Sequence, residues 1–267
     1  MARFSAVKQT GFGPIAILVF VMLYLPIIMM VVYAFNSGKS VALWEGFSLQ
    51  WFPKAFANEQ VKDATIRSLW LAATAAVLST ILATLAALGT TRRPAFRGQS
   101  VIYAMINQPL MVPEIVTAVA LLIVTAGIKV ITGYQGMGYL IAAHTAFCIP
   151  FAYLPIRARL EGMNNTLEIA AADLYARPFT IFRRITLPLL WPGIIAGMML
   201  AFVTSLDDVV ITQFVKSAGQ DTLPTYMLAQ LRRQITTEVN AISTALLAAT
   251  VLLLALFFLL TRNKTPT

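Results

Sequence analysis

The chain has 267 residues, of which 58% are hydrophobic and only 12% are charged. A soluble domain carries about twice that share of charged residues, because polar groups must cover its surface. The mean hydropathy of +0.76 is therefore too high for a soluble fold. The single cysteine excludes a disulfide scaffold, and the apolar content excludes a disordered chain. The remaining class is a protein that crosses a membrane several times.

Uncharged stretches locate the membrane spans. Five of them, from 22 to 30 residues long, lie between charged residues, and each exceeds the ~20 residues needed to cross the hydrocarbon core. A sixth apolar region runs from about Gln99 to Ile128 and contains one charge, Glu114. We predict an all-α fold in which residues 1–267 form a single domain. Its six transmembrane helices are expected near residues 12–35, 68–90, 100–127, 138–158, 188–209 and 241–261.

The distribution of charge indicates the orientation. If both termini lie on one side, that side holds twelve of the twenty lysines and arginines and only three acids. The positive-inside rule then predicts that both termini are cytoplasmic. The opposite side carries no net charge, so topology alone accounts for the pI of 9.9, and no nucleic-acid partner is expected.

The first outer loop, about residues 36–66, is rich in aromatic side chains. It contains Trp44, Phe47, Trp51 and Phe52. Tryptophan and tyrosine gather where the bilayer meets water, so the pattern favours an aromatic belt at the interface. The alternative is a docking surface for a partner outside the cell.

The loop at residues 159–187, placed in the cytoplasm by this topology, predicts two short helices. The first runs from Leu167 to Leu174 with Thr166 as a candidate N-cap, and the second from Phe179 to Arg184. Such a pair could lie on the lipid surface, or it could dock on a cytoplasmic motor. A motor would have to be a separate subunit, because the chain contains no glycine-rich nucleotide loop of the G-x-x-x-x-G-K-[ST] type.

This loop resembles the EAA loop of binding-protein-dependent ABC importer permeases, whose pattern is E-A-A-x3-G-x9-I-x-L-P. The positions that match are Ala170, Ala171, Ile185, Leu187 and Pro188. Two positions differ from the pattern. Ile169 stands in place of the usual glutamate, with Glu168 adjacent, and Tyr175 stands in place of the usual glycine. The resemblance implies that these eight residues couple the permease to its ATPase.

Further segments resemble the polyamine (spermidine and putrescine) permeases of that family. They are Y-A-F-N-S at 33–37, P-L-M-V-P-E-I-V at 109–116, H-T-A-F-C at 144–148 and S-L-D-D-V-V-I at 205–211. The resemblance implies a type I importer fold in a bacterial inner membrane. It also implies a second permease subunit, typically a different chain, two cytoplasmic ATPase subunits that hold ATP and Mg, and a periplasmic binding protein. No cofactor is expected in this chain.

Three acids at or near membrane depth predict the substrate pathway. Glu114 directly follows Pro113 inside the third span, where a carboxylate costs ~2.5–3.5 kcal/mol and should face protein or water. Pro109 and Pro113 predict a break in that helix. Asp207 and Asp208 lie at the outer end of the fifth span, ~100° apart on a helix, so one of them is expected to face the pathway. These acids suit an elongated cationic substrate. The alternatives are that the pair caps the next short helix and that Glu114 makes a structural contact.

No catalytic or metal-binding cluster is expected, so we do not predict an enzyme. His144 and Cys148 share one helix face at i and i+4, a spacing that packing inside a bundle explains. The function we predict is ATP-driven import of a polyamine or a related cationic amine. The rival is an ion-coupled secondary carrier, which commonly has inverted repeats and sites at the midplane. We find no convincing repeat, and a carrier would have no use for the loop at 159–187.

Overall fold

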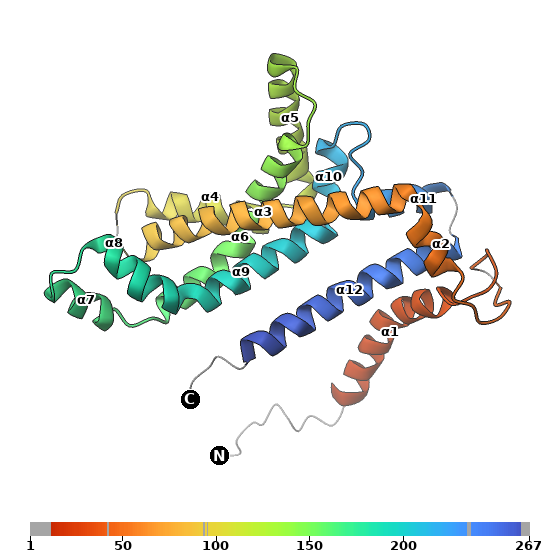
Figure 1. Ribbon diagram of the computed structural model, residues 1–267, viewed down its shortest axis with the longest axis horizontal. Helices are drawn as coiled ribbons and strands as arrows, with labels where there is room; N and C mark the ends of the chain where they lie inside the picture. Colours follow the sequence, from red (N-terminus) through yellow and green to blue (C-terminus); the bar gives the residue numbers. More distant parts are fainter. Residues whose placement is uncertain (1–11, 42, 93, 95, 234–235, 263–267) are drawn as a thin grey trace. The chain divides into compact units, whose positions relative to one another are not determined.

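The computed structural model describes residues 12–262, except 42, 93, 95, 234 and 235. The part of the chain that it describes forms helices and two isolated β-bridges, with no strand, so the all-α prediction is confirmed. The described residues group into two compact units (Figure 1). Unit 1 comprises residues 12–59 and 227–262, and unit 2 comprises residues 60–226.

Five of the described helical segments are long and apolar enough to cross a membrane. They are Gly13–Tyr33 in α1 (Phe12–Tyr33), α3 (Glu59–Thr91), α5 (Glu114–Thr132), α6 (Gly138–Glu161), and Pro178–Asp207, which ends in α9 (Leu187–Asp207). The sixth predicted span, at 241–261, falls within α12 (Thr237–Arg262), which contains the apolar segment Thr237–Leu252. The predicted count of six is therefore close to what the described residues form.

The third predicted span, 100–127, is broken into two helices. The first, α4, runs from Gln99 to Met111 and contains Pro109, and α5 begins at Glu114. Between them Val112 is extended, with φ −107° and ψ 141°. Proline disfavours helical backbone in the residue before it, so Pro113 is a sufficient cause of the break. The two helices run in different directions (Figure 1), and the break leaves Glu114 at the first position of α5.

In unit 2, α6 and α9 pack closely through small residues. A Cβ atom added to Gly197 would lie 2.6 Å from the carbonyl oxygen of Ala152, and one added to Gly193 would lie 2.7 Å from Cβ of Arg159. Glycines four residues apart lie on one helix face and let two backbones approach in a membrane. The absence of side chains at these two positions therefore sets the distance between α6 and α9.

Replacing Gly197 with alanine is expected to destabilise the permease by about 1–3 kcal/mol, because the new methyl group would overlap the backbone of α6. The matched control is Gly127→Ala in α5, where nothing lies within 4 Å of the added Cβ and alanine only improves helix propensity. Thermal unfolding of the detergent-solubilised protein measures both. Equal stability of the two variants would show that the α6–α9 contact relaxes without cost.

Unit 1 contains α1, α12 and the short helix α2 (Trp51–Ala57). Trp51 is buried with Ala34 and Ala241, and Phe35 and Phe52 pack around them. Trp51 therefore belongs to a small folded core and not to an interfacial belt. By contrast, the side chains of Trp44 and Phe47 remain exposed.

The buried side chain of Asn36 organises the loop that joins α1 to α2. Its amide nitrogen donates to the carbonyl oxygens of Ser40 and Leu43 at 3.0 and 2.8 Å, and its oxygen accepts the backbone N–H of Glu45 at 2.8 Å. The indole N–H of Trp51 in turn donates to the carbonyl oxygen of Asn36 at 2.8 Å. The side chain and backbone of one asparagine thus satisfy polar groups of the loop and of α2.

The loop at 159–187, called the coupling loop below, contains the two predicted helices. They are α7 (Thr166–Asp173) and α8 (Pro178–Ile181), and a π-helical turn, η2 (Phe182–Thr186), continues α8 into α9. In that turn the N–H of Leu187 donates to the carbonyl oxygen of Phe182, five residues earlier. Thr166 is the first helical residue of α7, and Asn165 is the N-cap. The side-chain oxygen of Asn164 accepts the N–H of Thr166 at 3.0 Å.

Candidate substrate pathway and coupling loop

Asp208 lies where the fifth span ends and caps the next helix. α9 ends at Asp207, Asp208 is extended, and α10 follows from Val210 to Val215. The carboxylate of Asp208 accepts the N–H of Ile211 at 3.1 Å and the N–H of Thr212 at 2.8 Å. It also accepts the hydroxyl of Thr212 at 2.8 Å. These bonds satisfy backbone donors that the first turn of α10 leaves without partners.

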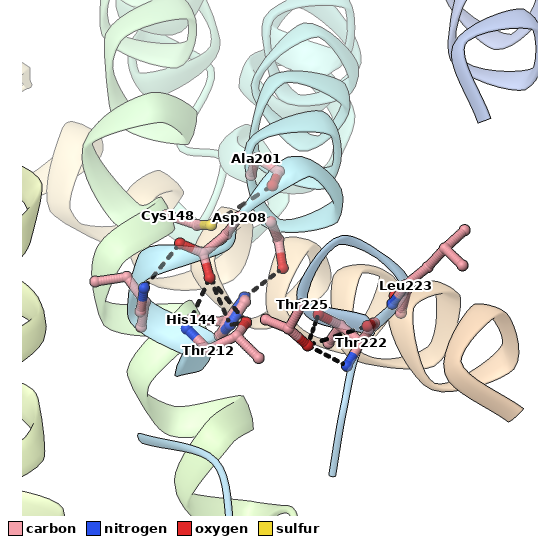
Figure 2. A network of polar contacts seen from close by, with 11 residues as sticks. His144, Cys148, Ala201, Asp208, Thr212, Thr222, Leu223 and Thr225 are labelled. Carbon is pink, nitrogen blue, oxygen red and sulfur yellow. Dashed lines mark hydrogen bonds and ion pairs between the residues drawn. The ribbon is translucent and has the colours of Figure 1, made fainter. Parts of the chain in front are cut away.

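His144 joins three helices through a buried polar network (Figure 2). Its Nδ1 lies 2.8 Å from Oγ of Ser205 in α9, and its Nε2 lies 3.0 Å from Oγ1 of Thr212 in α10. The same Nε2 is 3.4 Å from the carboxylate of Asp208. One turn further along α6, the thiol of Cys148 donates to the carbonyl oxygen of Ala201 at 3.5 Å. Both His144 and Cys148 are fully buried, as expected of residues packed inside a bundle.

The three predicted acids lie in different environments. Asp208 is buried, whereas its neighbour Asp207, the last residue of α9, is exposed. Glu114, exposed at the start of α5, lies close enough to Asp208 for the two carboxyl groups to interact electrostatically. The structure therefore brings Glu114 and Asp208 together. Two adjacent carboxyl groups at a helix break form a local site that attracts cations.

Polar contacts within the chain hold the coupling loop in place. The hydroxyl of Thr186 donates to the carboxylate of Glu168 at 2.8 Å, and Nη2 of Arg92 lies 3.6 Å from the same oxygen. Arg92 also donates to the side chain of Asn165. Glu168 therefore connects α7 to the end of α3 and to η2. The carboxylate of Glu168 therefore makes these polar contacts within its own chain.

Glu168→Ala is expected to loosen the coupling loop, because the buried hydroxyl of Thr186 and the guanidinium of Arg92 would both lose a charged partner. The loss should be about 1 kcal/mol, since the ion pair is partly exposed. Glu168→Gln is the matched control, because its amide oxygen still accepts the Thr186 hydroxyl. Limited proteolysis of the loop should be several-fold faster in the alanine variant than in the glutamine variant. Equal rates in both would contradict the anchoring role.

Tyr175 adopts a left-handed backbone conformation, with φ +59°. This conformation costs an L-residue with a side chain roughly 1–2 kcal/mol, and glycine avoids the cost. The family pattern has glycine at this position. The remaining predicted coupling residues lie nearby: Ile169, Ala170 and Pro188 are exposed, and Ala171, Ile185 and Leu187 are half-buried.

Sequence reasoning missed several residues of these sites. Thr212 and Ser205 contact His144, and Arg92 and Thr186 contact Glu168. All four are common polar residues whose partners lie far away in the sequence. Ser205 belongs to the S-L-D-D-V-V-I segment, but nothing in that segment indicates a contact with His144. Among the described residues, no group of three or more His, Cys, Asp and Glu side chains could hold a metal ion.

Comparison with known proteins identifies the family. Residues 79–266 match the model of the "binding-protein-dependent transport system inner membrane component" family. The putrescine transport system permease protein PotI of Escherichia coli K12 is 38% identical over 238 residues, 88% of this chain and 85% of the relative. The spermidine/putrescine transport system permease protein PotC of Haemophilus influenzae is 36% identical, over 92% of this chain and 94% of the relative.

Solved structures share the fold at lower sequence identity. A chain of a bacterial ABC transporter that imports the acidic polysaccharide alginate superposes with a TM-score of 0.72 and 16% identity, over 95% of this chain and 94% of the other. A chain of the methionine ABC transporter MetNI, in inward-facing conformations, gives a TM-score of 0.59 and 18% identity, over 78% of this chain and 100% of the other. The chain is therefore a member of the family of inner membrane components of binding-protein-dependent transport systems.

Proposed function

We propose that the chain is one transmembrane half of an ATP-driven importer that takes up polyamines such as putrescine and spermidine. The observation that carries the proposal is the identity of 34–38% to permeases named for putrescine or spermidine/putrescine transport, over 88–92% of this chain. Its partners would be a second permease subunit, two cytoplasmic ATPase subunits that bind ATP and Mg, and a periplasmic binding protein. As a multi-pass inner membrane protein, it would have both termini in the cytoplasm.

The acids near the break between α9 and α10 fit a cationic cargo. Glu114 and Asp207 are exposed on the surface of this chain and would contact the ammonium groups of a polyamine in transit. Asp208 is buried and bonded to α10 and His144, so its role would be to hold that turn in position and to add negative charge beside Glu114. An importer must release its cargo, and a few separate carboxylates bind an amine more weakly than a closed cage would.

The coupling loop supports the motor-driven mechanism. ATP binding closes the two ATPase subunits of such an importer, and a helix docked on them would move with them. From α7 the displacement would reach α9 through the Glu168–Thr186 hydrogen bond and α3 through the Glu168–Arg92 ion pair. Since η2 continues α8 into α9, the two helices would move as one rigid body.

The test is uptake of labelled putrescine by proteoliposomes that contain the permease, its partner subunits and the binding protein. We expect uptake to require ATP and Mg on the ATPase side and the binding protein on the opposite side. Ionophores that abolish proton and sodium gradients should leave the uptake unchanged. Uptake that persists without ATP and collapses with the ion gradient would identify a secondary carrier. If another solute is taken up with ATP and outcompetes putrescine, the polyamine assignment is wrong and that solute is the substrate.

A further inference from the structure

Tyr175 occupies the position after α7 where a helix that ends in this way usually has glycine. The N–H of Ala176 donates to the carbonyl oxygen of Ala171 at 3.0 Å, and the N–H of Tyr175 donates to that of Ala172 at 2.9 Å. This pair of bonds is the Schellman motif, whose left-handed residue is normally glycine. Tyr175 adopts the left-handed conformation in spite of its side chain.

Among the residues that the structure describes, no contact compensates for this strain. The side chain of Tyr175 is 95% exposed, so its ring gains almost no burial in the permease alone. Backbone strain persists where the surrounding structure enforces it, and it clusters at functional sites. Glycine would satisfy the same hydrogen bonds without strain. The benefit of tyrosine at this position must therefore come from outside this chain.

The neighbours of Tyr175 extend the exposed surface. Leu174 is 82% exposed and Phe179, at the start of α8, is 70% exposed. We call Leu174, Tyr175 and Phe179 the apolar tip of the coupling loop. Large exposed apolar groups that lie together mark sites of interaction with protein or membrane. The polar contacts of the loop, by contrast, are made with the permease itself, through Glu168.

A protein partner explains the apolar tip better than a bilayer does. A lipid surface accepts an aromatic ring in many positions, so it gives no reason to hold one ring in a strained conformation. An apolar pocket on a folded protein, by contrast, accepts the ring in one position only.

We propose that Tyr175 is the apolar anchor of the motor contact, inserted into an apolar socket on the ATPase subunit. In this chain the anchor would take the place of the acid that the family pattern has at 169, where Ile169 now stands 59% exposed. The inference rests on the proposed function, in which the coupling loop docks on the ATPase. It adds the residue that makes the contact and the chemistry of the surface that receives it.

The test compares Tyr175→Gly, Tyr175→Ala and Tyr175→Phe in the complete importer, expressed with its ATPase and purified in detergent. Glycine relieves the backbone strain and removes the ring. It should therefore stabilise the loop in the permease alone, but weaken ATPase association if Tyr175 is the anchor. If Tyr175 is the anchor, Tyr175→Gly and Tyr175→Ala should reduce co-purified ATPase at least tenfold, while Tyr175→Phe keeps most of it. Proteolysis of the loop in the permease alone should be slower in Tyr175→Gly than in the parent.

Two further variants define what each outcome means. Tyr134→Ala removes a half-exposed ring in the turn between α5 and α6, away from the coupling loop, and should leave ATPase association unchanged. Ala170→Arg with Ala171→Arg tests the docking of the loop as a whole. Normal association of Tyr175→Gly overturns the anchor, whether or not the loop binds lipid vesicles. If the double arginine variant also associates normally, the docking role of the loop fails as well.

Discussion

Asp208→Ala is expected to abolish polyamine uptake and to lower the stability of the permease by about 2–3 kcal/mol. The change removes the acceptor for the N–H groups of Ile211 and Thr212 and for the hydroxyl of Thr212. Each buried donor left unsatisfied costs about 1–3 kcal/mol, part of which is recovered by local rearrangement. His144 would also lose its charged neighbour. Thermal unfolding and uptake per assembled complex measure the two effects.

The neighbouring acid provides the matched control. Asp207→Asn changes the same charge at an exposed position, so stability should stay within about 0.5 kcal/mol of the parent. Uptake of a diamine or triamine should nevertheless fall several-fold, because a carboxylate of the pathway is lost, and Glu114→Gln should behave in the same way. Stable variants with undiminished uptake at both positions, and in combination, would leave these acids with a structural role alone.

Replacing Ala170 and Ala171 with arginine is expected to abolish uptake while the permease still inserts and folds. Neither position is fully buried, so the helix can accept the longer side chains, but two bulky cations would block a close contact with the motor. The ATPase activity that the binding protein stimulates should fall to the basal level of the isolated ATPase. Co-purification of the ATPase with the permease measures the docking directly.

Ala172→Arg is the control for this experiment. Ala172 is exposed on the same helix, ~200° around the axis from Ala170, and the family pattern places no requirement on it. It should retain most of the uptake. If the double arginine variant transports and binds the ATPase as the parent does, α7 is not the docking helix.

Hydropathy and proline positions predicted most of the architecture. Uncharged stretches are long because the bilayer excludes charge, so each span could be located from its own residues. Pro109 and Pro113 predicted the break in the third span, since the effect of proline on the backbone is local. Even there the break is at Val112, and α4 continues through Pro109. The sequence could not show which of the two prolines breaks the helix, because tertiary packing decides whether a helix continues through a proline.

The polar contacts of the sites could not be predicted in the same way. His144 meets Ser205 and Thr212, which lie more than 60 residues away in the sequence, and Glu168 meets Arg92 at a similar separation. Such pairs depend on how helices pack, and the composition of one segment carries no information about them. The sequence predicted a substrate pathway lined by three acids but could not show that Asp208 would be buried as a cap while Asp207 stayed exposed.

The π-helical turn η2 restricts how this loop can change in evolution. A π turn contains one residue more than the α turn it replaces, and such turns arise by single insertions into a helix. Deleting one residue between Phe182 and Thr186 would restore a regular α-helix and leave α9 intact. It would also rotate α7 and α8 by ~100° and shift them by ~1.5 Å relative to the membrane span. The number of residues between Tyr175 and Ile185 is therefore fixed by the direction in which the loop must face. Single-residue deletions in this segment should be rare among descendants that still transport.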